Sequence, residues 1–116
     1  MNKLIAYFIF PLMLSIASSA FAANRAVQIS IGGIGPGVDI AAFETVKQVI
    51  GYAVANGVID NFIVSGYGIE GGFSACAQAS PRTNAFNAFV RQLQSITPNK
   101  TTTGYSLRRV AACPGN

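Results

Sequence analysis

A glycine-rich reversal in the middle of the chain constrains the fold more than any other feature. Residues 59–78 read IDNFIVSGYGIEGGFSACAQ, in which four glycines separate a β-branched and aromatic run from a second short run. Glycine adopts the positive φ angles of a tight reversal at low cost, so this pattern predicts a β-hairpin. A helical pattern flanks the hairpin on each side, and one more strand pattern lies beyond each helix. The sequence therefore predicts the order strand, helix, hairpin, helix, strand.

The first 22 residues have the layout of a secretory signal peptide. Lys3 supplies a positive n-region, residues 4–16 form an apolar run, and residues 20–22 (AFA) match an A-x-A cleavage site. A membrane anchor is the alternative, but the run is shorter than the roughly 20 residues that a spanning helix needs. We predict cleavage after residue 22, which leaves residues 23–116 as one secreted or periplasmic domain with no membrane contact.

Composition narrows the classes of function. Without the signal peptide the chain keeps seven Lys and Arg against four Asp and Glu, a net charge of +3, and the cationic residues are scattered. This mild basicity is only weak support for an acidic partner, and a secreted chain without a basic patch is not expected to bind nucleic acid. The chain has no histidine, which excludes Ser-His and Cys-His nucleophile systems and argues against a zinc site. We predict no cofactor and no metal.

Cys76 and Cys113 are the only cysteines of the chain. Export to an oxidising compartment predicts that they form one intramolecular disulfide. In the chain-entropy model, closing a loop of this length stabilises the fold by roughly 4 kcal/mol, a large share of a small domain's stability. Free thiols or an intermolecular bond are the alternative.

Hydrophobic periodicity sets the elements of the first half. Alternation over residues 26–31 predicts a strand, and an apolar stripe predicts a helix over about 40–56 that Asp39 caps and Gly57 ends. Five of the six residues 32–37 that join these two elements are glycine or proline, which predicts a shaped, tight loop. Its spacing matches neither G-x-G-x-x-G nor a P-loop, so an anion site there is the weaker alternative.

The second half predicts another amphipathic helix. Ser80-Pro81 has the residue types of a helix start, and Pro98 ends an apolar stripe of helical spacing over residues 86–96. A polar loop separates this helix from the last strand. The apolar stripes of both helices are expected to share one core with the sheet, which includes Phe43, Phe86, Phe89, Leu93, Ile50, Ile29 and Phe73.

The order βαββαβ predicts an α+β two-layer sandwich of ferredoxin-like arrangement, with one four-stranded antiparallel sheet and two helices on one face. Right-handed crossovers give the sheet order 4-1-3-2. The last strand spans residues 105–112, and Leu107 and Val110 share a face only if a bulge lies near residues 108–109. Two strand spacings, about 9.6 Å, exceed the reach of a disulfide. Cys113 must therefore lie past its strand and curl under the first strand, or else the sheet has another order. An antiparallel sheet with one or two packed helices is the alternative.

The sheet face away from the helices is the first candidate surface. Alternation assigns it the polar side chains of Gln28, Ser30, Ser65, Tyr67, Ser74, Gln78 and Tyr105. Hydroxyls, amides and tyrosines suit recognition, since tyrosine offers contact area at low entropy cost. An ordinary solvated face is the alternative, and the exposed hairpin turn over residues 67–72 is the second candidate surface.

We expect a small binding module of unknown target, an inhibitor or accessory subunit whose partner is another protein and which has no chemistry of its own. Tyr67 and Tyr105 are expected to contribute most to binding. One alternative is a small hydrolase with an unrecognised site among the carboxylates of Asp39, Asp60 and Glu70. Another is a self-associating structural protein that uses an exposed edge strand.

Overall fold

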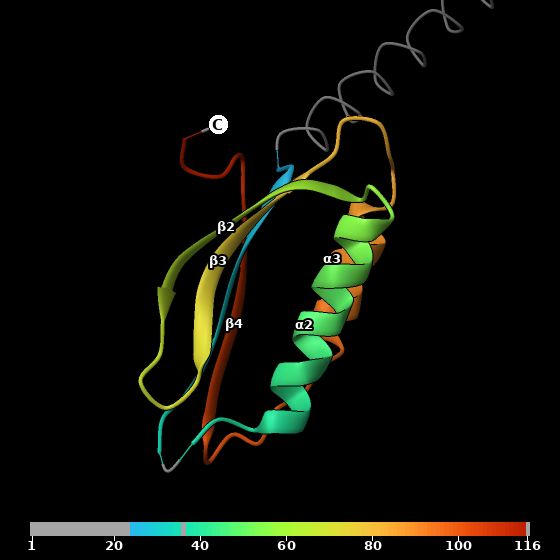
Figure 1. Ribbon diagram of the computed structural model, residues 1–116. Helices are drawn as coiled ribbons and strands as arrows, with labels where there is room; N and C mark the ends of the chain where they lie inside the picture. Colours follow the sequence, from blue (N-terminus) through green and yellow to red (C-terminus); the bar gives the residue numbers. More distant parts are fainter. Residues whose placement is uncertain (1–23, 36, 116) are drawn as a thin grey trace, which may run out of the picture.

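Four strands form one antiparallel sheet in the order β2-β3-β1-β4 (Figure 1). The strands are β1 (Ala26–Gly33), β2 (Ile59–Tyr67), β3 (Gly72–Ala79) and β4 (Thr103–Val110). The computed structural model describes residues 24–35 and 37–115, so the predicted signal peptide lies outside the described residues. Counted from its other edge, the sheet has the order 4-1-3-2, which confirms the predicted topology.

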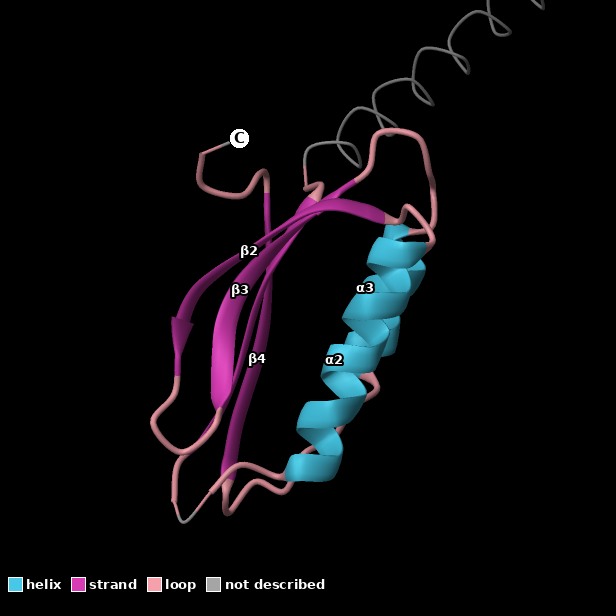
Figure 2. Ribbon diagram, viewed as in Figure 1, coloured by secondary structure: helices cyan, strands magenta, loops and turns pink. Residues whose placement is uncertain are grey.

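Both helices cover the same face of the sheet (Figure 2), so the fold is the predicted two-layer α+β arrangement. The helices are α2 (Ile40–Ala55) and α3 (Phe86–Gln94). The Asp39 carboxylate caps α2 by accepting a hydrogen bond from the Ala42 N–H at 3.2 Å. The chain leaves α2 through Gly57, whose φ of 71° lies in the left-handed region that favours glycine.

The core lies between the two helices and the sheet. Phe86, Phe89 and Leu93 of α3 are each at most 3% exposed and pack against the inner face of the sheet. Ile29 of β1 is buried in the same cluster, and Phe43 of α2 packs against it. The predicted shared core is therefore confirmed, together with the remaining members Ile50 and Phe73.

Helix α3 begins later than the Ser80-Pro81 pair predicts. The Ser80 side chain is buried, its hydroxyl accepts the Arg82 N–H at 3.3 Å, and its carbonyl accepts a hydrogen bond from the Arg25 guanidinium at 2.6 Å. These bonds hold Ser80 in a turn that ties the approach to α3 onto the start of β1. The helix starts only at Phe86, without a side-chain cap.

The last strand has no bulge near residues 108–109, so this prediction is wrong. β4 pairs with β1 in continuous register along its whole length. Leu107 packs on the helix side and Val110 packs on the opposite side, against a cluster that contains Ala26, so no bulge is needed to bury both. Within the described sheet the irregularities lie in β2 instead, at Asp60 and at Ser65.

The glycine loop after β1 packs against the hairpin turn. The Gly33 N–H donates to the Gly71 carbonyl at 3.0 Å, and the Val38 N–H donates to the Glu70 carbonyl at 3.1 Å. A Cβ atom at Gly33 would lie only 2.8 Å from the Glu70 carbonyl oxygen, so this close approach requires glycine. The loop is thus a tight packing element, and these N–H groups are already used within the protein.

Candidate functional site

The sheet face away from the helices, here called the outer face, carries a row of serines across all four strands. Ser30 of β1 pairs with Ser74 of β3 and with Ser106 of β4, and the Ser30 and Ser74 hydroxyl oxygens are 3.2 Å apart. Ser65 of β2 joins this hydroxyl row because its hydroxyl donates to the Ser74 carbonyl at 3.2 Å. Since a serine hydroxyl both donates and accepts, the row can hydrogen-bond either kind of polar group.

A second row crosses the outer face two residues further along the strands. Ile63, Cys76, Gln28 and Arg108 lie side by side on β2, β3, β1 and β4. This mixed row changes from apolar at Ile63 to cationic at Arg108, a separation of about 14 Å if each strand spacing is about 4.8 Å. The Arg108 side chain is exposed and makes no hydrogen bond or ion pair with residues 24–35 or 37–115.

The C-terminal tail, residues 111–115, returns over the outer face. Cys113 lies past the end of β4 and forms the predicted disulfide with Cys76, with a Cα–Cα distance of 5.7 Å. The Cys113 N–H also donates to the Gln78 side-chain oxygen at 2.9 Å, and the Gln78 amide nitrogen donates to the Arg25 carbonyl at 3.3 Å. Gln78 lies on the predicted face, but its amide holds the tail in place.

A small apolar cluster fixes the tail further. The disulfide sulfurs lie among Ala26, Ile63 and Val110, and the Ala26, Cys76 and Cys113 side chains are at most 5% exposed. Burial on the outer face is unusual for a two-layer sandwich, whose second face is normally in water. The tail therefore acts as a short third layer over one end of the sheet.

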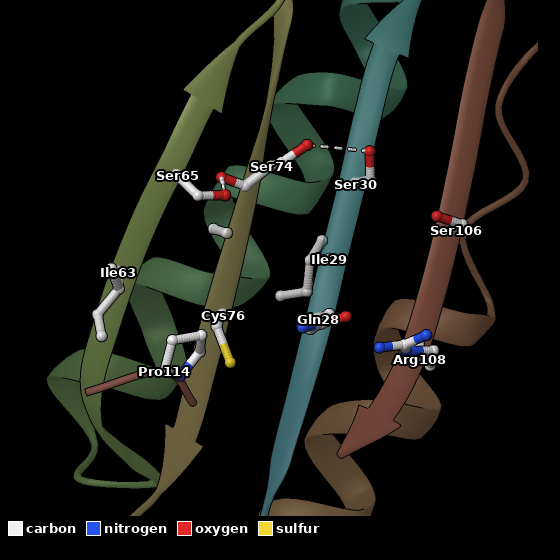
Figure 3. Close-up of a pocket in the computed structure, with 11 residues that line it drawn as sticks. Gln28, Ile29, Ser30, Ile63, Ser65, Ser74, Cys76, Ser106, Arg108 and Pro114 are labelled. Carbon is white, nitrogen blue, oxygen red and sulfur yellow. Dashed lines mark hydrogen bonds between the residues drawn. The ribbon is translucent and has the colours of Figure 1, made fainter. Parts of the chain in front are cut away.

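The two rows and the tail enclose a groove of about 490 Å³. Figure 3 shows Pro114 of the tail over Cys76, and Arg108 on the far side of Gln28. The groove is lined by Gln28, Ile29, Ser30, Ile63, Ser65, Ser74, Ala75, Cys76, Ser106, Arg108 and Pro114. Four of the predicted surface residues, Gln28, Ser30, Ser65 and Ser74, thus come together in one concave site.

Tyr105 does not lie on the outer face, and this part of the prediction is wrong. Tyr105 pairs with Ile31, which faces the helices, and its hydroxyl donates to the Leu93 carbonyl of α3 at 2.6 Å. Burial raises the pKa of Tyr105 to about 12. The tyrosine therefore joins β4 to α3, and it is not available to a ligand in the groove.

Replacing Tyr105 by phenylalanine is expected to lower the free energy of unfolding by about 1 kcal/mol at neutral pH, because the hydrogen bond from its hydroxyl to the Leu93 carbonyl is lost. The raised pKa adds a test at alkaline pH. The unfolded chain ionises first, so stability is full below the unfolded pKa and falls as pH rises toward about 12. Tyr105→Phe should lose part of this alkaline dependence in urea titrations, whereas Tyr52→Phe, at an exposed helix position, should leave the free energy of unfolding at neutral pH unchanged. Equal behaviour of the two variants would contradict this role.

Tyr67 also differs from its predicted position. The irregularity at Ser65 shifts the alternation of β2, so that Tyr67 pairs with the inward-facing Phe73. Tyr67 is 82% exposed and lines a separate apolar hollow of about 280 Å³ between α2 and β2, together with Phe43 and Phe62. The tyrosine is accessible, but it lies on the helix side of the sheet and outside the groove.

Ser106 and Arg108 are groove residues that the sequence analysis did not assign to this face. The alternation of side chains along the last strand does indicate their position. If Tyr105 and Leu107 point inward, Ser106 and Arg108 point outward. Val110 breaks this simple pattern, because it is apolar and yet lies on the outer face.

The candidate carboxylates do not gather at the groove. Asp60 is the second residue of β2 and Glu70 lies beyond the other end of that strand, about 20 Å away at 3.3 Å per residue. The Asp39 carboxylate accepts the Asn99 and Ala42 N–H groups, and these bonds hold its pKa below the usual value. No carboxylate lines the groove, and no cluster of three or more metal-ligating side chains occurs in the described part of the chain.

The fold and the groove define a class: a small disulfide-bonded α+β domain whose open sheet face is walled by its own C-terminal tail. Comparisons with protein-family models, curated proteins and solved structures found no match to the chain. Among residues 24–35 and 37–115, no helix is long and apolar enough to cross a membrane.

Proposed function

We propose that this chain is a secreted or periplasmic binding module, an inhibitor or accessory subunit that recognises another protein through the outer-face groove. The observation that carries this proposal is the groove itself, which has the hydroxyl row along its floor, the disulfide-anchored tail at one end and, at the other end, Arg108, which has no ion-pair partner among the described residues. None of the described residues that line the groove is a carboxylate, so binding accounts for the site better than hydrolysis does.

Rigidity supports a binding role. The floor of the groove is made of strand residues, and the Cys76–Cys113 bond and the Gln78 side chain restrain its wall. A site that is already ordered loses less conformational entropy when a partner binds. A small domain with this construction can therefore recognise its target without rearranging.

The chemistry of the groove favours a protein over a nucleic acid. Polyanion binding requires several cations that follow a phosphate backbone, whereas Arg108 is the only charged residue among the described residues that line the groove. The apolar part of the lining, at Ile63 and Pro114, suits side chains of a protein partner. Export is supported by the signal-like composition of residues 1–22 and by the disulfide, which is typical of oxidising compartments.

Filling the groove with a tryptophan tests the proposal. Ser106→Trp places a large ring in the groove from an exposed position, where its effect on the fold should be small. Gln92→Trp is the matched control, because it adds the same ring at an exposed position of α3. In affinity capture from the exported fraction of the native cells, we expect Ser106→Trp to lose the partner that the wild type and Gln92→Trp retain.

Two outcomes would count against this function. If Ser106→Trp retains the partner at wild-type levels, the groove is not the binding site. If the captured species is a second copy of the chain through another surface, self-association replaces the proposed role. Circular dichroism of both variants establishes that any loss of binding occurs in a folded protein.

A further inference from the structure

We infer that the groove recognises an extended peptide segment with an apolar residue and an acidic residue four positions apart. This inference rests on the proposed binding function and specifies its ligand. It comes from the mixed row, which has an apolar end at Ile63 and a cationic end at Arg108.

The cationic end defines the acidic position of the ligand. Arg108 is exposed, lines the groove and has no acidic partner among the residues that the structure describes. A guanidinium presents paired N–H donors that match a carboxylate. Because none of the described groove residues neutralises Arg108, an incoming Asp or Glu side chain is the complementary group.

The opposite end of the mixed row defines the apolar position. Ile63 is partly buried against the disulfide, and Pro114 of the tail lines the same end of the groove. This end contains carbon and sulfur surface, and burial of an apolar side chain against it is favourable. A charged or amide side chain would lose water against Ile63, Cys76 and Pro114, none of which has a polar side-chain group to replace that water.

The spacing of the ligand residues follows from strand geometry. Three strand spacings separate β2 from β4, or about 14 Å. An extended peptide advances about 3.3 Å per residue, so positions i and i+4 are about 13 Å apart and point to the same side. A spacing of three residues places the two side chains on opposite sides, so one of them must leave the groove.

The hydroxyl row explains why the ligand is a peptide and not an isolated anion. Ser30, Ser74 and Ser106 lie in register beside the mixed row, and each hydroxyl can donate or accept. The backbone of an extended peptide presents alternating N–H and C=O groups, which such hydroxyls can satisfy. Arg108 can therefore bind one acidic side chain of the ligand while the serine hydroxyls bind the peptide backbone beside it.

The test uses synthetic peptides and the isotope-labelled protein from residue 23 onward with its disulfide intact. Acetylated, amidated pentapeptides carry Leu and Glu at the two ends with three serines between them, in both orders. Control peptides replace Glu by Gln, or shorten the spacer to two serines. In NMR titrations, we expect the better Glu peptide to shift amide signals of groove residues such as Gln28, Ser74 and Ser106, with either control binding about tenfold more weakly.

A matched pair of arginine variants tests the role of Arg108. Arg108→Gln should weaken the Glu peptide about tenfold and leave the Gln peptide unchanged. Arg91→Gln removes the same charge from an exposed position of α3 and should leave both peptides unaffected. Equal weakening by both variants, equal binding of the Glu and Gln peptides, or no groove shifts at millimolar peptide would each overturn the inference.

Failure of this inference is distinguishable from failure of the proposed function. If Ser106→Trp loses the native partner and Arg108→Gln retains it fully, the groove binds a partner whose recognition does not need an acidic residue. If Ser106→Trp retains the partner, the binding site lies elsewhere and the proposed function fails.

Discussion

Changing Cys76 and Cys113 together to serine is expected to lower the free energy of unfolding by about 4 kcal/mol. The two residues are 37 positions apart, and the lost bond frees the unfolded chain from a loop of that size. Both side chains are also nearly fully buried, so each new hydroxyl needs a partner that the apolar cluster does not offer. Total stability of a small domain is about 5–15 kcal/mol, so this loss is a large part of it.

Urea unfolding of the double variant, followed by circular dichroism, measures the loss. The corresponding double alanine variant separates the causes, because it removes the bond without adding hydroxyl groups. We expect the alanine variant to remain well below the wild type and the serine variant to fall somewhat lower. A double serine variant within about 1 kcal/mol of the wild type would show that the disulfide contributes little to folding.

The same variants also link stability to the groove. Cys113 holds the tail over the outer face, and without the disulfide the Gln78 hydrogen bond and the apolar packing of residue 113 against the Ala26 cluster remain to retain it. The sheet and both helices do not depend on the tail for their core. The double variant should therefore keep its fold under mild conditions and bind groove ligands more weakly.

Most of the fold could be predicted from the sequence because its signals are local. The glycines between residues 66 and 72 indicate the hairpin, and two apolar stripes indicate helices that must cover one sheet face. The position of Cys113 beyond its strand also followed from a distance limit, since two strand spacings exceed the reach of a disulfide. Each of these steps needs only periodicity or covalent geometry.

The errors arise where tertiary contacts override local pattern. Ser80 has the chemistry of a helix cap, yet the Arg25 guanidinium binds its carbonyl and holds it in a turn. Tyr67 was assigned by uninterrupted alternation, and the irregularity at Ser65 reverses its face. One extra residue in a strand moves every later side chain to the other face of the sheet, and the alternation pattern of the sequence does not reveal where such a residue lies.

The candidate site could be predicted only in part for the same reason. Gln28, Ser30 and Ser74 lie on regular strands, so alternation placed them on the correct face. The concave shape depends on where the tail lies, and no periodic pattern in residues 111–115 specifies a path across the sheet. The floor of the groove, on the outer face, could therefore be predicted from the sequence, whereas the position of the tail that walls it could not.

Replacing Phe89 by alanine is expected to lower the free energy of unfolding by about 3–5 kcal/mol. Phe89 is 3% exposed, and its ring lies 5.9 Å from that of Phe86 in the layer between α3 and the sheet. Truncation removes apolar contacts and leaves a cavity that the rigid sheet cannot close. Urea unfolding monitored by circular dichroism gives the loss directly.

Phe62→Ala is the matched control for this effect. Phe62 is only partly buried at the edge strand β2, where it lines the hollow beside α2, and its ring lies 6.0 Å from that of Phe73. Water already reaches this hollow, so truncation there should create no closed cavity and should cost clearly less than Phe89→Ala. A loss below about 1 kcal/mol at Phe89, or equal losses at both positions, would mean that the α3 stripe does not carry the core. Both rings lie on the helix side of the sheet, so a larger loss at Phe89 would show that the closed layer under α3 stabilises the domain more than the open hollow beside α2.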